Sequence, residues 1–257
     1  MLSLPFTCWA VYFFLLAYTH AGPLPPGAQL YWCVLLPSFQ PLPLTRRPEP
    51  FSHPDWLFEV KYDVFRALAY RDPSGVRLVS RNGNRFASFT DLCAGIELFL
   101  KARHAVLDGE IACLDEQGHS RFNQLLFRRG VPRFCAFDLL YLDGQDLRDR
   151  PLIERKRALR RIVPDGCPFL LYVDYVAAEG ERLFQLACDR DLEGIVAKHG
   201  QSRYEVADGN PAWLKIRNRR YSQMIGRDEL FERRYEAAGA PEIGWDVCDR
   251  AAAVAGG

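Results

Sequence analysis

Apolar and polar residues alternate regularly from Trp56 onward, and this pattern predicts a fold rich in β-strands. Strands at 57–62, 65–70 and 76–80 open the pattern, and an Asn-Gly turn at 82–83 follows them, as is typical of a β-meander. Further strands are predicted at 105–114, 133–142, 170–176, 194–198 and 213–216. Helical spacing of apolar residues predicts helices at 91–103, 153–162 and 179–190. This mixture predicts an α+β fold with much antiparallel sheet.

The chain before this pattern has a different composition. Residues 2–18 are almost wholly apolar, as in a signal-peptide core or a short membrane segment, but no Lys or Arg precedes them. The stretch at 21–50 is rich in proline and matches no folded pattern. We therefore expect residues 1–35 to be a disordered leader or a translated upstream stretch. The protein is expected to be cytoplasmic and nucleoid-associated, with membrane attachment or export as the alternative.

The charge of the chain gives no overall basic field. Its 257 residues include 33 basic and 32 acidic ones, for a net charge of +1, so any surface that binds nucleic acid must be a local patch. Its 8 cysteines include no C-x-x-C pair and no histidine partner at metal-ligand spacing. We interpret them as reduced, mostly buried thiols of a cytoplasmic protein.

The candidate chemistry lies in charged residues attached to predicted strands. Alternation along the first strand puts Glu59, Lys61 and Asp63 on one face. Taken alone, a lysine between two carboxylates is typical of a solvated surface strand. Four further clusters follow: Ser80-Arg81-Asn82-Gly83, Asp108-Gly109-Glu110, EGIVAK at 193–198 and WLKIR at 213–217. Neither of the glycine-rich phosphate-binding motifs, G-x-x-x-x-G-K-S/T and G-x-G-x-x-G, follows a predicted strand, so a nucleotide site must be built from side chains.

In their order and spacing, these motifs resemble the covalent nucleotidyltransferase superfamily of DNA ligases, RNA ligases and mRNA capping enzymes. The lysine motif of that superfamily, K-x-D-G-x-R, matches residues 61–66 apart from Val64. Three sequence segments are most similar to the ATP-dependent DNA ligases of bacterial end joining and repair: 107–111 (LDGEI), 137–144 (FDLLYLDG) and 193–198. The resemblance implies an ATP-grasp-like adenylation domain of antiparallel sheets flanked by helices over residues 36–234, followed by a flexible tail at 235–257.

The resemblance also implies ATP-dependent chemistry centred on Lys61. Attack on the α-phosphate of ATP needs an unprotonated amine, and Lys198, Lys215 and a bound metal could lower its pKa while neutralising the phosphates. Glu110 and Glu193 offer the hard oxygen donors that suit Mg²⁺, although either could be a plain surface charge at a strand end. The lysyl-AMP product would pass AMP to the 5′-phosphate at a nick in double-stranded DNA.

By the same resemblance, further residues would bind the nucleotide. Phe137 would stack on adenine, although an aromatic residue in so apolar a strand would by default lie in the core. Glu59 would lie beside the adenine edge, while Arg66 and Arg81 would approach the ribose, the phosphates or the 5′-phosphate of DNA. The helix at 153–162 is strongly basic, and a solvated face is favoured there over contact with nucleic acid.

Two departures from the family pattern leave other functions open. Val64 stands where the motif has glycine, and a β-branched residue is poorly tolerated at a positive φ or a close backbone approach. Residues 225–257 show no run of alternating strands, so we expect no OB-fold domain and a separate protein that supplies this or an end-binding function. RNA ligase or capping-type transfer is one alternative. An inactive relic or a nucleic-acid-binding partner is the other.

Overall fold

The computed structural model describes residues 36–62, 64–206 and 211–224. Outside the described residues lie the predicted leader at 1–35, Asp63 and the predicted tail at 235–257. Within the described ranges the strands form two sheets, which we call sheet A and sheet B, with helices packed on both. The α+β class predicted from the sequence is confirmed.

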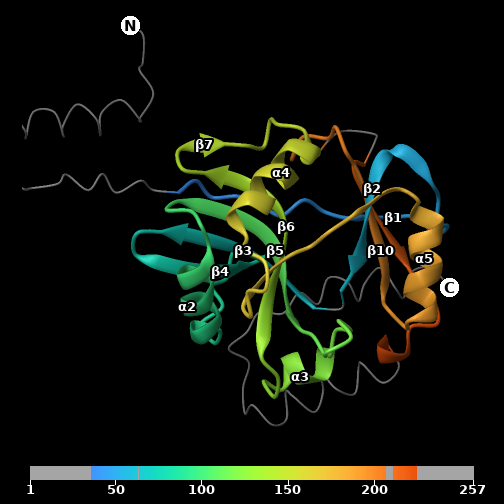
Figure 1. Ribbon diagram of the computed structural model, residues 1–257, viewed down its shortest axis with the longest axis horizontal. Helices are drawn as coiled ribbons and strands as arrows, with labels where there is room; N and C mark the ends of the chain where they lie inside the picture. The colour runs from blue at the N-terminus through green and yellow to red at the C-terminus, as the bar shows by residue number, and fades with distance from the viewer. Residues whose placement is uncertain (1–35, 63, 207–210, 225–257) are drawn as a thin grey trace, which may run out of the picture. The chain divides into compact units, whose positions relative to one another are not determined.

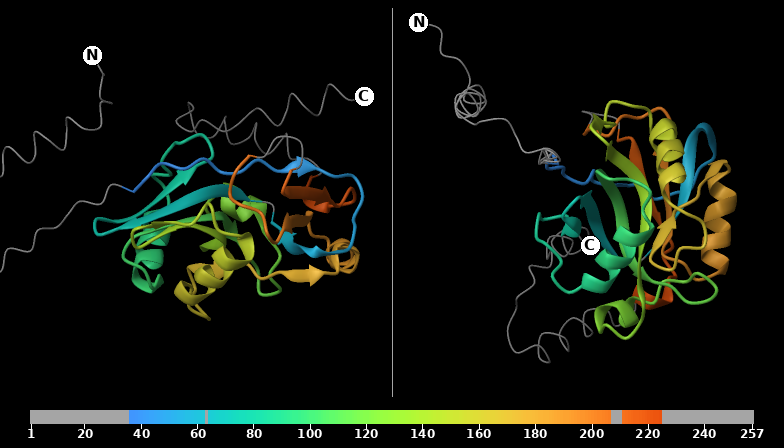
Figure 2. Two further views of the ribbon diagram at one scale, coloured as in Figure 1. Left: turned by 90° about the horizontal axis from the view of Figure 1, so that it is seen from above. Right: turned by 60° about the vertical axis from the view of Figure 1, so that its left-hand side comes forward.

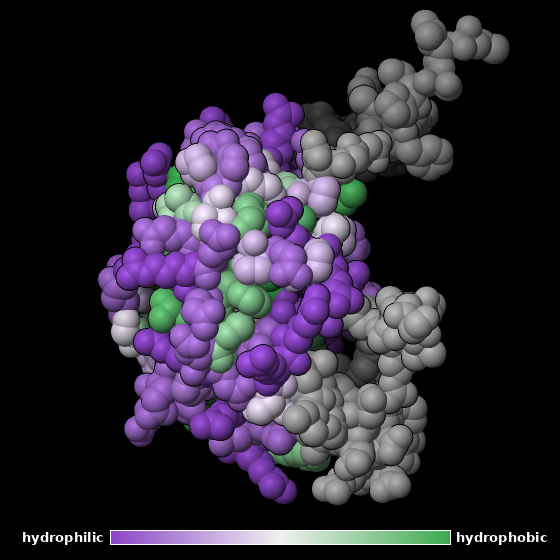
Figure 3. Space-filling view, turned by 90° about the vertical axis from the view of Figure 1, so that its right-hand side faces the viewer, coloured by the Kyte–Doolittle hydropathy of each residue, from purple (hydrophilic) through white to green (hydrophobic). Residues whose placement is uncertain are grey.

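Sheet A has five strands and is mainly antiparallel. In spatial order its strands are β1 (Thr45–Arg46), β11 (Trp213–Arg217), β10 (Gly194–His199), β2 (His53–Lys61) and β9 (Val176–Ala178). Helix α5 (Gly180–Asp189) covers one face, where its Ala187 packs with Phe58, Ile195 and Ile216 of the sheet (Figure 1). The side of the molecule that carries α5 is mainly hydrophilic, with a few apolar residues between polar ones (Figure 3). The apolar side of α5 is therefore turned inward, onto the sheet.

Sheet B has six strands and carries the other two long helices. Its main path is β4 (Gly75–Ser80), β3 (Phe65–Asp72), β5 (Ala105–Cys113), β6 (Pro132–Leu142) and β7 (Gln145–Asp146), and β8 (Leu170–Tyr172) pairs with β6 in parallel. Ile96 of helix α2 (Thr90–Phe99) and Leu159 of helix α4 (Leu152–Ile162) pack in one apolar cluster with Leu107 of the sheet. Among the described residues, the remaining helices are the short α3 (Phe122–Leu126) and the 3-10 helix η1 (Ser222–Met224).

A second apolar cluster lies between the two sheets. It contains Leu57 and Trp213 from sheet A and Leu68, Val106 and Leu140 from sheet B. Seen from above, sheet A with α5 and sheet B with α2 lie on opposite sides of this interface (Figure 2). The chain therefore buries both faces of each sheet, which explains why β6 is buried along almost its whole length.

Most predicted elements are confirmed within a few residues, but the single strand predicted at 170–176 is wrong. The chain forms β8 in sheet B, leaves it after Tyr172, and joins sheet A as β9 at Val176. Val173 donates its N–H to the carbonyl of Ala136, so the crossing segment stays hydrogen-bonded. Alternation along a run does not reveal which sheet receives it, because both sheets bury similar apolar faces.

Two observations concern the cysteines and the helices of the described residues. The described cysteines, Cys93, Cys113, Cys135, Cys167 and Cys188, form no disulfide, and three of them are buried. In the part of the chain that the structure describes, no helix combines the length and apolar character needed to cross a membrane.

Candidate active site

One face of sheet A gathers side chains from three neighbouring strands. Residues directly opposite one another in antiparallel strands point to the same face, so the register of β2, β10 and β11 defines three rows. In that strand order, the rows are Lys61, Gly194 and Arg217; Glu59, Val196 and Lys215; and Leu57, Lys198 and Trp213. Strands far apart in the sequence therefore bring four predicted site residues side by side on the face of sheet A toward sheet B: Glu59, Lys61, Lys198 and Lys215.

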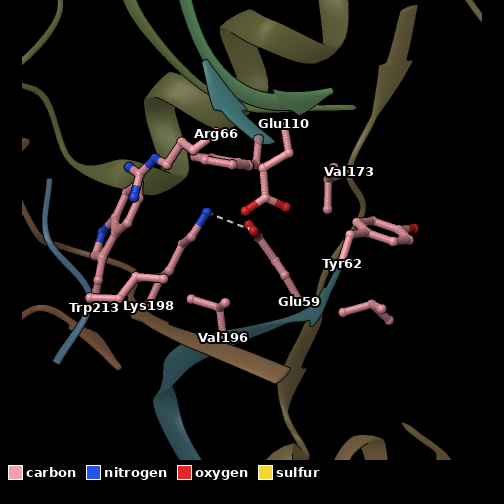
Figure 4. Close-up of a pocket in the computed structure, with 11 residues that line it drawn as sticks. Glu59, Tyr62, Arg66, Glu110, Val173, Val196, Lys198 and Trp213 are labelled. Carbon is pink, nitrogen blue, oxygen red and sulfur yellow. Dashed lines mark hydrogen bonds and ion pairs between the residues drawn. The ribbon is translucent and has the colours of Figure 1, made fainter. Parts of the chain in front are cut away.

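Sheet B supplies the opposite wall of a pocket. Arg66 of β3, Glu110 of β5 and Phe137 of β6 line it together with Glu59 and Lys198 of sheet A. The carboxylate of Glu110 points toward Glu59 and Lys198 (Figure 4). The pocket has a volume of about 20 Å³, enough for a single water molecule. A nucleotide can therefore enter only if lining side chains move.

Lys61, at the end of β2, is held by a carboxylate. Its Nζ donates to Oε2 of Glu193 at 2.7 Å, and both side chains are largely buried. Burial alone would lower the pKa of Lys61, but Glu193 and Glu110 outweigh burial and raise the pKa above its ordinary value of 10.5. Arg217 opposes this rise only in part. In this state Lys61 is therefore protonated at neutral pH, and the predicted lowering of its pKa by Lys198, Lys215 and a bound metal stays a prediction.

The two carboxylates predicted to hold Mg²⁺ both act on Lys61. Burial raises the pKa of Glu110 to about 7, while Lys61 and Arg66 act in the opposite direction and Glu193 adds to the rise. Within the described ranges, no group of three or more His, Cys, Asp or Glu side chains is arranged to hold a metal ion. Mg²⁺ commonly binds one or two carboxylates and completes its shell with waters and phosphate oxygens. Glu110 and Glu193 therefore fit a Mg²⁺ ion that is also bound by phosphate oxygens, rather than one bound by protein ligands alone.

A buried carboxylate between two lysines forms the centre of the pocket. Glu59 accepts a hydrogen bond from Lys198 at Oε2 and one from Lys156 of α4 at Oε1, each at 2.6 Å; the first is drawn in Figure 4. The exposed fraction of each of these side chains is 3% or less. Burial lowers the pKa of Lys198 below its ordinary value of 10.5; Glu59 opposes this change and Lys156 adds to it. Two cations thus share one anion away from water, which leaves positive charge available to an anionic ligand.

Phe137 faces the pocket because of an irregularity in β6. The pairing of β5 with β6 includes Ala136 and Asp138 but skips Phe137, which is therefore the extra residue of a β-bulge. Bulges redirect side chains and are common beside active sites. The Phe137 ring is 7% exposed, and its centroid lies 3.9 Å from Nζ of Lys198. The ring predicted to stack on adenine is therefore in contact with an ammonium group.

The indole N–H of Trp213 lies in the pocket wall and has no hydrogen-bond acceptor among the described residues. Its side chain is 2% exposed, its ring centroid lies 4.1 Å from Nζ of Lys198, and its Nε1 has no hydrogen-bond partner among the described residues. A buried N–H without a partner costs about 1–3 kcal/mol. An oxygen of a bound ligand could accept this hydrogen, so the atom fits a nucleotide site.

Arg66 is fixed by a buried carboxylate. Its Nε and Nη2 donate to the two carboxylate oxygens of Asp108 at 3.0 and 2.6 Å, and the hydroxyl of Tyr204 also donates to Asp108 at 2.6 Å. Gly109 is required by close packing, because an added Cβ would lie 2.5 Å from an aromatic ring of β6. In the Asp-Gly-Glu motif, Asp108 and Gly109 therefore hold the sheet and Arg66 in place, and Glu110 is the member that lines the pocket.

The structure also locates the other predicted positions. Arg81 is exposed in the turn after β4 and does not line the pocket. Val64 packs against two apolar clusters. Within the described part of the chain, positive φ angles outside glycine occur at Arg128, Asp143, Ala178 and Asp191. Val64 therefore does not have the positive φ that would make a β-branched residue unfavourable at this position.

The prediction of a solvated basic face on α4 is wrong for two of its residues. Arg155 and Lys156 are almost fully buried, and Arg155 donates from Nε and Nη2 to Asp138 at 2.8 Å each. The sequence did contain a signal, because Leu152, Arg155, Lys156 and Leu159 follow the i, i+3, i+4, i+7 spacing of a buried helical stripe. Lys156 is thus a site residue that the sequence analysis missed, because the basic character of the helix favoured a solvated face.

Comparison with known proteins places these residues in a family context. The family model for the ATP dependent DNA ligase domain matches residues 46–217, which is more than half of the chain. The matched range holds every residue of the three rows on sheet A and almost all of the pocket lining.

Individual relatives cover similar parts of the chain. The SPbeta prophage-derived DNA ligase-like protein LigB of Bacillus subtilis is 28% identical over 191 residues, 72% of this chain and 69% of LigB. The multifunctional non-homologous end joining DNA repair protein LigD of Mycobacterium tuberculosis is 31% identical over 172 residues, 66% of this chain but only 22% of LigD. The solved structure of mycobacterial DNA ligase D complexed with ATP and MES matches with a TM-score of 0.61 and 30% identity, over 70% of this chain and 60% of that one.

Proposed function

The chain belongs to the family of ATP-dependent DNA ligase domains, and on that basis we propose that it attaches AMP to Lys61. The unprotonated amine attacks the α-phosphorus of ATP, a P–N bond forms, the bond to the bridging oxygen breaks, and pyrophosphate leaves. The nitrogen releases one proton to solvent as the phosphoramidate forms. One observation carries the proposal: the predicted charged residues of two sheets converge beside one pocket, with Lys61 in the row next to Glu59.

The neighbours of Lys61 support this role. Lys61 must lose its proton before attack, and the contact with Glu193 that favours the proton must be released at that point. Glu110 and Glu193 would hold Mg²⁺, which when bound supplies positive charge near the phosphates. Lys198 and Lys215 would add positive charge beside the phosphates as pyrophosphate departs.

We further propose that nicked double-stranded DNA is the acceptor. An oxygen of the 5′-phosphate would displace Lys61 from the adenylate, and the 3′-hydroxyl would then displace AMP as the nick is sealed. The names of the relatives support DNA over RNA and suggest a role in DNA repair. A role in recombination is proposed from the resemblance alone. The match covers only 22% of LigD. The separate protein with an OB-fold or end-binding function, expected from the sequence pattern, remains part of the proposal.

The test is covalent labelling of the purified chain. We expect incubation with Mg²⁺ and α-labelled ATP to leave a label that survives denaturation, and Lys61→Ala to remove it. Lys101→Ala, which changes an exposed lysine, is the matched control and should label like wild type. A label that persists in Lys61→Ala, or no label on the wild type at any ATP concentration, would refute the proposed lysine chemistry. Nicked DNA and nicked RNA added to the labelled protein then identify the acceptor.

A further inference from the structure

The two lysines that share Glu59 are held in very different ways. Nζ of Lys156 donates to Oε1 of Glu59 at 2.6 Å, to the carbonyl of Val173 at 3.0 Å and to the carbonyl of Phe137 at 3.3 Å. An ammonium group has three hydrogens to donate, so Lys156 is fully satisfied in this position. Moving it would leave a buried carboxylate and two buried carbonyls without their donor, which is costly. Lys156 is therefore a fixed partner of Glu59.

Lys198 is bound much less completely. Among the described residues, Oε2 of Glu59 is its hydrogen-bond acceptor, at 2.6 Å. Its other contacts are with the rings of Phe137 and Trp213, whose centroids lie 3.9 and 4.1 Å from Nζ. Such cation–π contacts are weaker and less directional than hydrogen bonds to a carboxylate. Lys198 can therefore exchange Glu59 for another anion, provided that Lys156 stays to neutralise the carboxylate.

In the proposed adenylation, Phe137 and Glu59 are the residues expected to bind the base, and Lys198 lies against both of them. The pocket is too small for a base while the ammonium of Lys198 lies against Phe137 and Glu59. If Lys198 turns toward phosphates, a ring face of Phe137 and one carboxylate oxygen of Glu59 become available together. An ionised carboxylate only accepts hydrogen bonds, so it favours an exocyclic amino group and disfavours a carbonyl oxygen at the same position.

We propose that Lys156 is a positioning residue for base selection: it holds Glu59 in place as an anionic acceptor, so that the 6-amino group of ATP can replace Lys198 on Oε2. This inference rests on the proposed adenylation of Lys61. Lys156 acts through Glu59 and does not touch the nucleotide. Its importance is greatest in the nucleotide-bound state, where it is the remaining cationic partner of a buried carboxylate.

The experiment compares Lys156→Met with wild type in labelling of Lys61 by ATP and by GTP. We expect the KM for ATP to rise about 10- to 100-fold, since a charge-assisted contact to the base-binding carboxylate is lost, while kcat changes much less. The ratio of kcat/KM for ATP to that for GTP should fall about 10-fold or more, because Glu59 without Lys156 is no longer held as a hydrogen-bond acceptor beside the 6-substituent of the base. Arg157→Met, an exposed change on the same helix, should alter neither quantity.

A double-mutant cycle separates positioning from a general loss of structure. In the Glu59→Gln background, Lys156→Met should cause no further fall in the ATP to GTP ratio, because the group it positions is already neutral. The double variant has Gln at position 59, so no buried carboxylate loses its cationic partner. It can therefore be measured even if Lys156→Met alone does not fold. Equal losses with ATP and GTP, or an unchanged ratio in Lys156→Met, would overturn the inference.

Failure of the proposed function gives a different pattern. If the wild type acquires no label, adenylation of Lys61 is refuted, and equilibrium binding of ATP and GTP by calorimetry tests the inference instead. Preference for ATP that Lys156→Met abolishes would still support the positioning role. No preference in the wild type, or a preference that Lys156→Met retains, would overturn it.

Discussion

Replacing Glu110 by Gln should stabilise the folded protein above neutral pH, although it removes a residue proposed for catalysis. Burial raises the pKa of Glu110 from its ordinary 4.5 to about 7, so the folded protein holds this proton more tightly than the unfolded chain does. The free energy of unfolding therefore falls as the pH rises from 4.5 to about 7, and levels off above that. A pKa rise of this size corresponds to about 3 kcal/mol, a cost that the neutral Gln avoids.

Urea unfolding followed by tryptophan fluorescence in EDTA measures this difference. We expect Glu110→Gln to exceed wild type by about 3 kcal/mol at about pH 8 and to match it at pH 4.5, where Glu110 is protonated in the folded protein. Glu116→Gln makes the same charge change at an exposed position and should have little effect at either pH. A variant no more stable than wild type at the higher pH, or equally stabilised at both, would refute the reasoning. The same variant should label poorly with ATP, since stability and activity conflict at this residue.

Three other substitutions test neighbouring features. Glu193→Gln removes one of the negative charges that raise the pKa of Lys61 and weakens the hydrogen bond to it, so Lys61 should react with an amine reagent at lower pH than in wild type; an unchanged pH profile would contradict this. Val64→Gly should lower the free energy of unfolding by about 1–2 kcal/mol rather than improve the protein, because Val64 packs on two apolar clusters; thermal melting that shows a gain would count against this packing. Asp108→Asn leaves the guanidinium of Arg66 without its anion and should cost about 3 kcal/mol in urea unfolding, together with a higher KM for ATP; wild-type values for both would mean that the pair positions nothing.

Local periodicity was sufficient to predict much of the fold. Strands repeat every two residues and helices about every 3.6, so the apolar pattern located nearly all of the long elements. The same period of two placed Glu59 and Lys61 on one face before any partner strand was known. The order of charged motifs then indicated a nucleotide site made of side chains, and the pocket between the sheets contains Glu59, Arg66, Glu110, Phe137 and Lys198 from that prediction.

Pairing between distant segments was not readable in this way. Lys156 and Glu59 are separated by 97 residues, and Tyr204 and Asp108 by 96, yet each pair meets in the interior. The transfer of the chain from sheet B to sheet A near Val173 was likewise hidden in one apolar run. Periodicity reflects backbone geometry over a few residues, so it shows which face of an element is buried. The partner of a buried charge depends on which segments pack against that face, and only the folded arrangement of the two sheets and α4 supplies it.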